Sequence, residues 1–127
     1  MKKYLFLFIA SFCLLSCSKD EGYGGLASIS GKVFARDFNS SGVLVSEGYI
    51  AGMKVYISAH DGGGFYDDID TYPDGSFKFN FLHEGEYDIW VIGDCDYCPW
   101  DQTYVLKTVR VSSKKENVIV EDFIISI

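Results

Sequence analysis

Apolar and polar residues alternate over most of the chain after residue 26, and a period of two is typical of strands that bury one face. The pattern predicts seven strands, at residues 29–35, 53–59, 65–71, 77–81, 87–91, 105–111 and 117–127. Lys107 interrupts the alternation of the sixth strand. The last strand changes phase near Glu121-Asp122, so we expect a β-bulge there. No stretch is convincing as a helix.

Short runs of turn-forming residues separate the predicted strands. They lie at residues 62–64, 73–75, 84–85 and 112–115. Asp74-Gly75 suits a tight turn, and we expect the three phenylalanines that follow it, Phe77, Phe79 and Phe81, to face the core. Short strands with turn signals about every 8 to 12 residues predict an antiparallel β-sandwich.

The first residues have the pattern of a secretory signal peptide. Lys2 and Lys3 form a short basic start, and residues 4–15 form an almost unbroken apolar run. A helix needs about 20 apolar residues to cross a bilayer, so this run is too short to span one. We therefore expect the protein to be exported.

The residues after the apolar run indicate a lipid anchor. Leu14-Leu15-Ser16-Cys17 resembles a bacterial lipobox, after which the signal is cut before Cys17 and that cysteine is lipidated. Lys19-Asp20-Glu21 resembles a signal that sends lipoproteins of some Gram-negative bacteria to the cell surface. The alternatives are an ordinary signal peptide with a free Cys17, and a solvated linker after it.

These features divide the chain into three parts. Residues 1–16 are the predicted lipoprotein signal peptide, residues 17–25 the lipidated cysteine and a short tether, and residues 26–127 one β-sandwich domain. The location that follows is the outer membrane, facing the cell surface or the periplasm. The membrane is then a partner through the lipid anchor, because each buried methylene contributes about 0.8 kcal/mol.

Acidic residues are concentrated in the middle of the chain. The net charge is −7, and eleven acids but one base, Lys78, lie between Asp61 and Asp101. Such a field favours cations or basic partners and repels nucleic acid. A hydrophobic content of 48% and an aromatic content of 17% exclude a disordered chain.

Four segments of the predicted domain carry a family resemblance. They are Ile29 to Val33, Gly52 to Ile57, Thr71 to Phe79 and Leu82 to Ile89. In this order they resemble the carboxypeptidase regulatory-like domain, a transthyretin-like (prealbumin-like) seven-stranded antiparallel Greek-key β-sandwich. The resemblance implies a non-catalytic module that docks or assembles with other proteins. The chain departs from the family at His83-Glu84 and in a long insertion from Asp37 to Ala51.

Cys95 and Cys98 are the cysteines that remain once Cys13 leaves with the signal and Cys17 is lipidated. In an exported protein, such a pair predicts a small structural disulfide, which contributes about 2 kcal/mol. A redox-active pair is the alternative. It requires a depressed thiol pKa, and the acids around this pair oppose the thiolate.

Two histidines are candidate metal ligands. Because successive connections of an antiparallel sandwich alternate between its ends, His60 and His83 should approach the same end. Cys95 and Cys98 should lie at the opposite end, about 20 Å or more away, which excludes a zinc site built from all four residues. Exposed turn histidines without a metal are the simpler interpretation.

Four acids near a glycine-rich run could supply oxygen ligands to calcium. They are Asp61, Asp67, Asp68 and Asp70. Their spacing does not match an EF-hand, and a solvated acidic surface is the simpler interpretation, so we expect no cofactor. Four loop aromatics could instead stack on sugar rings or cover the ends of the sandwich: Tyr66, Tyr72, Tyr97 and Trp100.

The chain carries no GxSxG, HExxH or P-loop motif, so we do not expect an enzyme. The sequence predicts a membrane-anchored, non-catalytic binding or assembly module whose partner is a protein of an outer-membrane or surface complex. A calcium-dependent or aromatic-lined glycan-binding domain is the second interpretation. A thiol redox protein is the third.

Overall fold

The computed structural model describes residues 20–127, so the predicted signal peptide, Cys17 and Lys19 lie outside the described residues. The strands are β1 (Tyr23–Phe38), β2 (Leu44–Tyr49), β3 (Lys54–Ala59), β4 (Tyr66–Asp70), β5 (Ser76–Leu82), β6 (Gly85–Asp94), β7 (Gln102–Val111), β8 (Asn117–Ile119) and β9 (Phe123–Ser126). A short 3-10 helix, Pro99–Asp101, precedes β7. Within residues 20–127, no helix has the length and apolarity to cross a membrane.

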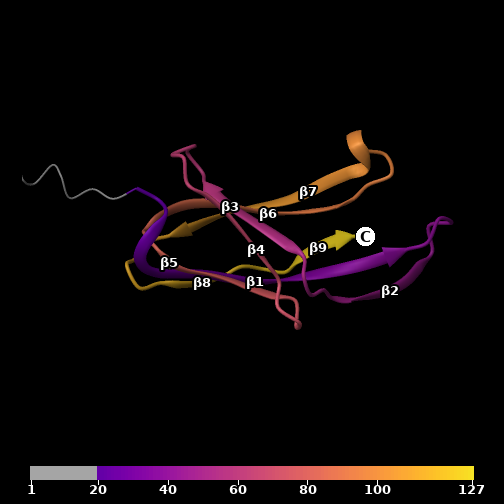
Figure 1. Ribbon diagram of the computed structural model, residues 1–127, viewed down its shortest axis with the longest axis horizontal. Helices are drawn as coiled ribbons and strands as arrows, with labels where there is room; N and C mark the ends of the chain where they lie inside the picture. The colour runs from indigo at the N-terminus through magenta and orange to yellow at the C-terminus, as the bar shows by residue number, and fades with distance from the viewer. Residues whose placement is uncertain (1–19) are drawn as a thin grey trace, which may run out of the picture.

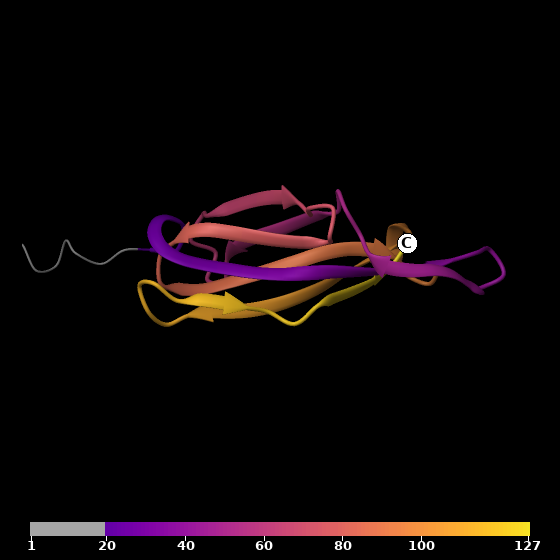
Figure 2. The same ribbon diagram turned by 90° about the horizontal axis from the view of Figure 1, so that it is seen from below.

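The strands form two facing sheets, which make a β-sandwich (Figure 1, Figure 2). β1 is the central strand of the first sheet. Its N-terminal half pairs with β5 and β8, and its C-terminal half pairs with β2 and β9. The second sheet has the order β4-β3-β6-β7 and is antiparallel throughout.

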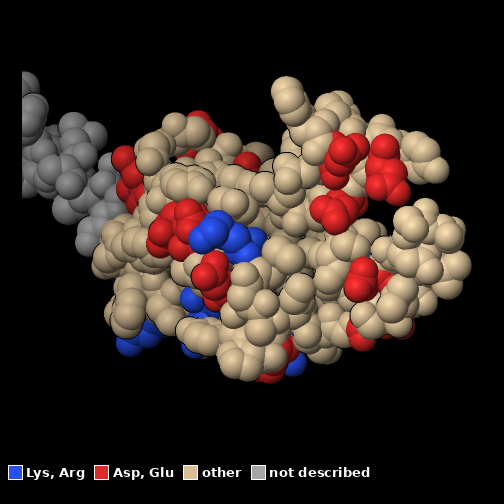
Figure 3. All heavy atoms as spheres, turned by 45° about the vertical axis from the view of Figure 1, so that its right-hand side comes forward, with Lys and Arg blue, Asp and Glu red and all other residues tan. Residues whose placement is uncertain are grey.

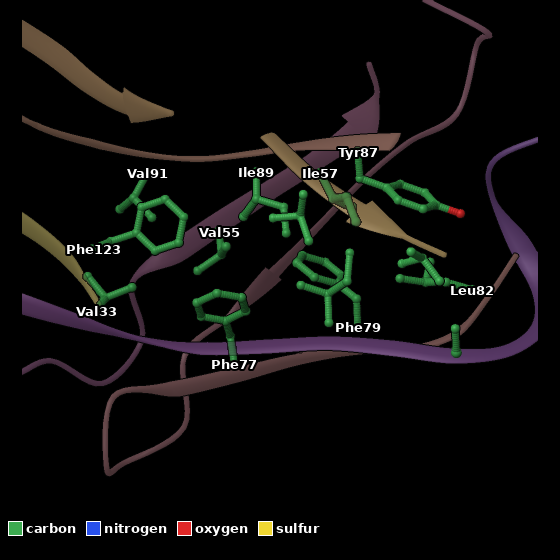
Figure 4. Packing of buried hydrophobic residues seen from close by; sticks show 14 of the residues in the cluster. Val33, Val55, Ile57, Phe77, Phe79, Leu82, Tyr87, Ile89, Val91 and Phe123 are labelled. Atoms are coloured by element: carbon green, nitrogen blue, oxygen red, sulfur yellow. The ribbon is translucent and has the colours of Figure 1, made fainter. Parts of the chain in front are cut away.

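The core lies between the two sheets and is built from the inward phase of their strands. Figure 4 shows Val33, Phe77 and Phe79 of the first sheet facing Ile57 and Ile89 of the second. All of them are essentially inaccessible to solvent. Their burial supplies the main stabilising free energy of the fold, about 25 cal/mol for each Å² of apolar surface removed from water.

The described residues contain nine strands where the sequence predicts seven, and β8 and β9 pair with β1 in parallel, so the seven-stranded antiparallel Greek-key arrangement is not confirmed. β2 lies inside the predicted insertion 37–51 and pairs with the last residues of β1. It lacks an alternating pattern because most of its residues are exposed. The C-terminal run divides into β8 and β9. It has one extra residue between the pairs Ser30–Ile119 and Val33–Phe123, which is the predicted bulge.

Phe81 does not face the core, which corrects the prediction for the third phenylalanine of β5. Between the pairs Ile29–Phe79 and Ala27–Leu82, β5 contains one residue more than β1. This bulge reverses the phase of the strand, so Leu82 points inward and Phe81 is 66% exposed with a positive φ of 61°. The sequence pattern shows no sign of the bulge.

Lys107, the residue that interrupts the alternation of β7, closes one side of the sandwich. Its ammonium group donates hydrogen bonds to the carbonyl oxygens of Glu121 and Asp122, at 3.1 and 3.2 Å. It also lies 5.1 Å from the centre of the Phe123 ring. The bulge between β8 and β9 leaves these carbonyl groups without strand partners, and the Lys107 ammonium group supplies their hydrogen bonds. Lys107 and the bulge are therefore two irregularities of the sequence pattern that form one contact.

The N-terminal residues are joined to the core by Tyr87. The Tyr87 hydroxyl accepts a hydrogen bond from the Gly22 N–H at 3.0 Å and donates one to the His83 carbonyl at 2.7 Å (Figure 4 shows the hydroxyl directed towards the start of β1). Burial raises the pKa of Tyr87, so the hydroxyl keeps its proton. β1 begins at Tyr23, so the ordered domain includes part of the predicted tether.

We predict that Tyr87→Phe lowers the free energy of unfolding by about 1 to 2 kcal/mol, because it removes two hydrogen bonds and leaves the Gly22 N–H without its partner. Chemical denaturation of the purified protein measures the loss, and hydrogen exchange should accelerate at Gly22. Tyr104→Phe, which removes the hydroxyl of an exposed tyrosine, is the control. Equal stability of the two variants would contradict the proposed role of Tyr87.

Candidate functional site

The acids predicted as calcium ligands take part in separate local contacts. Tyr23 donates a hydrogen bond to Asp67 at 2.5 Å. The Lys54 ammonium group lies 3.1 Å from Asp68 and 3.2 Å from Asp70. These two carboxylates raise the pKa of Lys54, first through hydrogen bonds and then through their charge. Among residues 20–127, no three His, Cys, Asp or Glu side chains are placed to hold a metal ion together.

The other candidate metal ligands lie near one end of the sandwich but line different cavities. His83 lines a cavity of about 370 Å³, and His60 and Asp61 line a second one of about 550 Å³. Glu84 borders both cavities, so the two histidines do share an end, as predicted. The connection between β6 and β7, which holds the two cysteines, lies at the opposite end (Figure 1).

His60 belongs to a polar row that crosses the outer face of the second sheet. Its Nδ1 lies 2.8 Å from the Asp88 carboxylate, and its Nε2 lies 3.9 Å from Glu86. Thr108 donates a hydrogen bond to the same oxygen of Asp88, and Arg110 lies 3.3 Å from Glu86. The hydrogen bond and then the charge of Asp88 raise the pKa of His60. This row is a network of surface charges, and the ion pairs that His60 forms in it depend on pH because they require a protonated imidazole.

Cys95 and Cys98 form a disulfide in the connection between β6 and β7, which confirms the predicted bond. Backbone hydrogen bonds from Cys95 N–H to the Asp101 carbonyl and from Asp101 N–H to the Cys98 carbonyl close the same connection. The bond and these contacts hold the connection in a compact turn.

The four aromatic residues predicted to stack on sugars do not form one surface. Tyr66 lies in β4, whereas Tyr72 lies in the turn between β4 and β5. Tyr97 and Trp100 lie in the connection between β6 and β7, at the end opposite to the start of β1 (Figure 1). Of the four, Tyr66 has other aromatic side chains beside it within the described residues.

An aromatic and apolar surface covers the outer face of the second sheet. We call it the outer-face patch, and its members are Tyr56, Tyr66, Trp90, Tyr104 and Leu106. The rings of Tyr56 and Trp90 are nearly parallel, with centroids 5.4 Å apart, and Tyr66 lies 6.3 and 6.4 Å from them. Leu106 is the cross-strand neighbour of Trp90. Tyr104 and Leu106 are 66% and 46% exposed.

Sequence reasoning missed four members of the outer-face patch, because it used the alternation only to find the core. Tyr56, Trp90 and Leu106 occupy the outward phase of their strands, where polar residues are expected. The sequence signal that could have revealed the patch was the presence of apolar residues in the outward phase of three predicted strands. These residues lie side by side only because the strands are ordered β3-β6-β7 in the sheet, and the alternation does not reveal that order.

Acidic side chains border the outer-face patch. Asp68 is the cross-strand partner of Tyr56, and its carboxylate accepts a hydrogen bond from Tyr66 at 3.2 Å. Asp88 lies in the outward phase of β6, next to the patch. Partial burial and this hydrogen bond raise the pKa of Tyr66. The site therefore combines an apolar centre with hydrogen-bond acceptors at its margin.

No family model matches the chain, and no curated protein matches it. A Pseudomonas aeruginosa protein, provisionally described as carbohydrate-binding, shares 15% identity with a TM-score of 0.50 over 84% of this chain and 93% of its own. The plantain pollen allergen Pla l 1 shares 13% identity with a TM-score of 0.50 over 78% of this chain and 91% of its own. The Bacillus cereus major pilin subunit shares 15% identity with a TM-score of 0.47 over 76% of this chain and 29% of its own. The first two of these similarities show a fold related to other all-β domains.

We predict that the contribution of His60 to stability is larger at low pH. Because the folded state raises the pKa of His60, its contribution is fully present below the unfolded value of about 6.5 and is lost as pH rises through the folded value. The difference in unfolding free energy between the wild type and His60→Gln should therefore be greater at pH 5.5 than at pH 8.5. In an Asp88→Asn background, this pH dependence should largely disappear. A difference that is independent of pH would contradict the prediction.

Proposed function

We propose that the protein is a lipid-anchored, non-catalytic binding or assembly module of the bacterial outer membrane. The lipobox-like residues before Cys17 support the anchor, and Lys19-Asp20-Glu21 supports display at the cell surface. The β-sandwich is compatible with the transthyretin-like, carboxypeptidase regulatory-like class that the sequence motifs resemble. In this proposal, the partner is a protein of an outer-membrane or surface complex.

The outer-face patch is the observation that carries the proposed binding role. Monomeric proteins seldom expose contiguous aromatic and apolar surface without a functional reason, and Tyr and Trp are enriched where proteins bind one another. Basic groups on this face are already engaged, because Lys54 pairs with Asp68 and Arg110 pairs with Glu86. A partner with an apolar centre and basic residues around it would complement this surface.

A neutral glycan is the second candidate ligand for the same patch. Aromatic rings beside carboxylates that accept hydrogen bonds can bind the apolar faces and the hydroxyl groups of sugars. The clustering of Tyr56, Tyr66 and Trp90 favours this candidate, and the description of the Pseudomonas aeruginosa protein is compatible with it. We do not include calcium as a ligand in this proposal, because Lys54 and Tyr23 already contact three of the candidate acids.

The proposed binding role predicts a partner contact at Leu106. A photoreactive benzophenone side chain in place of Leu106 should give a discrete protein adduct in intact cells, and Asp68→Lys with Asp88→Lys should weaken it by reversing the charge at the margin. The same probe at Ile119, an exposed residue of the first sheet, is the matched control. Two results together would favour the glycan over the protein partner. Leu106 would give no adduct, and the protein would be retarded in a gel that contains a neutral polysaccharide, with this retardation abolished by Tyr66→Ala.

The anchor predicts that Cys17→Ala abolishes incorporation of labelled palmitate and releases the protein from membranes, because no acyl chain is then attached. The substitution Lys19→Ala with Asp20→Ala and Glu21→Ala should retain the label but reduce digestion of the protein by protease added to intact cells. Palmitate labelling that survives Cys17→Ala would contradict the anchor. Protease resistance of the wild type on intact cells, with digestion after lysis, would contradict surface display.

A further inference from the structure

The connection between β6 and β7, residues 94–101, lies at the end of the sandwich opposite to the start of β1, the same end as the connection between β1 and β2 (Figure 1, Figure 2). We call it the distal tip. Tyr97 is 100% exposed and Trp100 is 93% exposed, the two highest values among the large apolar side chains of residues 20–127. Neither ring helps to build the core, so stability of the fold does not account for them.

The distal tip holds its two aromatic residues in an ordered turn. The Cys95–Cys98 disulfide closes the turn, and Cys98 N–H and Asp101 N–H donate hydrogen bonds to the Cys95 and Cys98 carbonyls. The backbone that carries the rings is thus ordered before any partner arrives. Preorganisation of this kind lowers the conformational entropy lost on binding, which favours association through a small surface.

The charge of the distal tip identifies the kind of ligand that fits it. Asp94, Asp96 and Asp101 surround the two rings in the sequence, and none of them forms an ion pair with Lys or Arg among the described residues. Figure 3 shows a group of acidic side chains at the upper right of the molecule without a basic side chain beside them. The carboxylates favour a cation, and the faces of Trp and Tyr attract Lys and Arg as well.

We infer that the distal tip is a second binding site, which takes an arginine- or lysine-bearing segment of a protein partner. The cationic side chains stack on Tyr97 and Trp100 and pair with the surrounding carboxylates. Anionic polymers and anionic bilayers are disfavoured by the same charges. The site shares no residue with the outer-face patch, so the inference stands even if the ligand proposed for that patch proves wrong.

The full chain in detergent, titrated with a capped peptide of alternating Arg and Gly, provides the test. Amide NMR signals of residues 94–101 should shift saturably, and a peptide with Gln in place of Arg should leave them unchanged. Tyr97→Ala and Trp100→Ala should each weaken binding about threefold or more. Asp96→Asn with Asp101→Asn should weaken it similarly and reduce its dependence on salt. Tyr72→Ala removes an exposed aromatic ring elsewhere and should have no effect.

Four results would overturn the inference. The first is the absence of saturable shifts at millimolar peptide. The second is equal binding of the Arg and Gln peptides, or stronger shifts with a neutral oligosaccharide or anionic vesicles. The third is a set of shifts centred on Tyr104 and Leu106, which would place the cationic ligand on the outer-face patch instead. Unchanged binding after Trp100→Ala would likewise reject the site.

Discussion

Pairing of β1 on both of its edges is the constraint on which the first sheet depends. Four other strands bind to this sixteen-residue strand, and three of them come from distant parts of the chain. Gly31 shows how closely they pack, because a Cβ atom there would lie 2.8 Å from the Phe77 ring and 2.7 Å from Val120. A larger residue would separate β1 from the core and the C-terminal run at once.

The second sheet carries an exposed aromatic surface because its two faces are used differently. The inward-facing residues of β3, β6 and β7 pack in the core, whereas their outward-facing residues contribute to the outer-face patch and to the polar row around His60. No helix or further strand of residues 20–127 covers that face. The same alternation that builds the sandwich therefore also directs aromatic side chains to its outer face.

The two ends of the sandwich differ in chemistry. At one end, Tyr87 holds Gly22 close to the core, so a lipid anchor at Cys17 would lie only a few residues from the folded domain. At the other end, the disulfide holds Tyr97 and Trp100 in solvent among carboxylates. A domain held in this way would present its distal tip away from the membrane, where a soluble or surface-bound partner can reach it.

The sequence by itself determined the β-sandwich class, the approximate strands, the turn at Asp74-Gly75 and the disulfide, because alternation, glycine turns and cysteine spacing are local signals. It also indicated the C-terminal bulge through a change of phase. Only the tertiary structure decided that Phe81 faces solvent and that Tyr56, Trp90 and Leu106 meet on one face. Those outcomes depend on cross-strand register, and register is set by pairing between residues far apart in the chain.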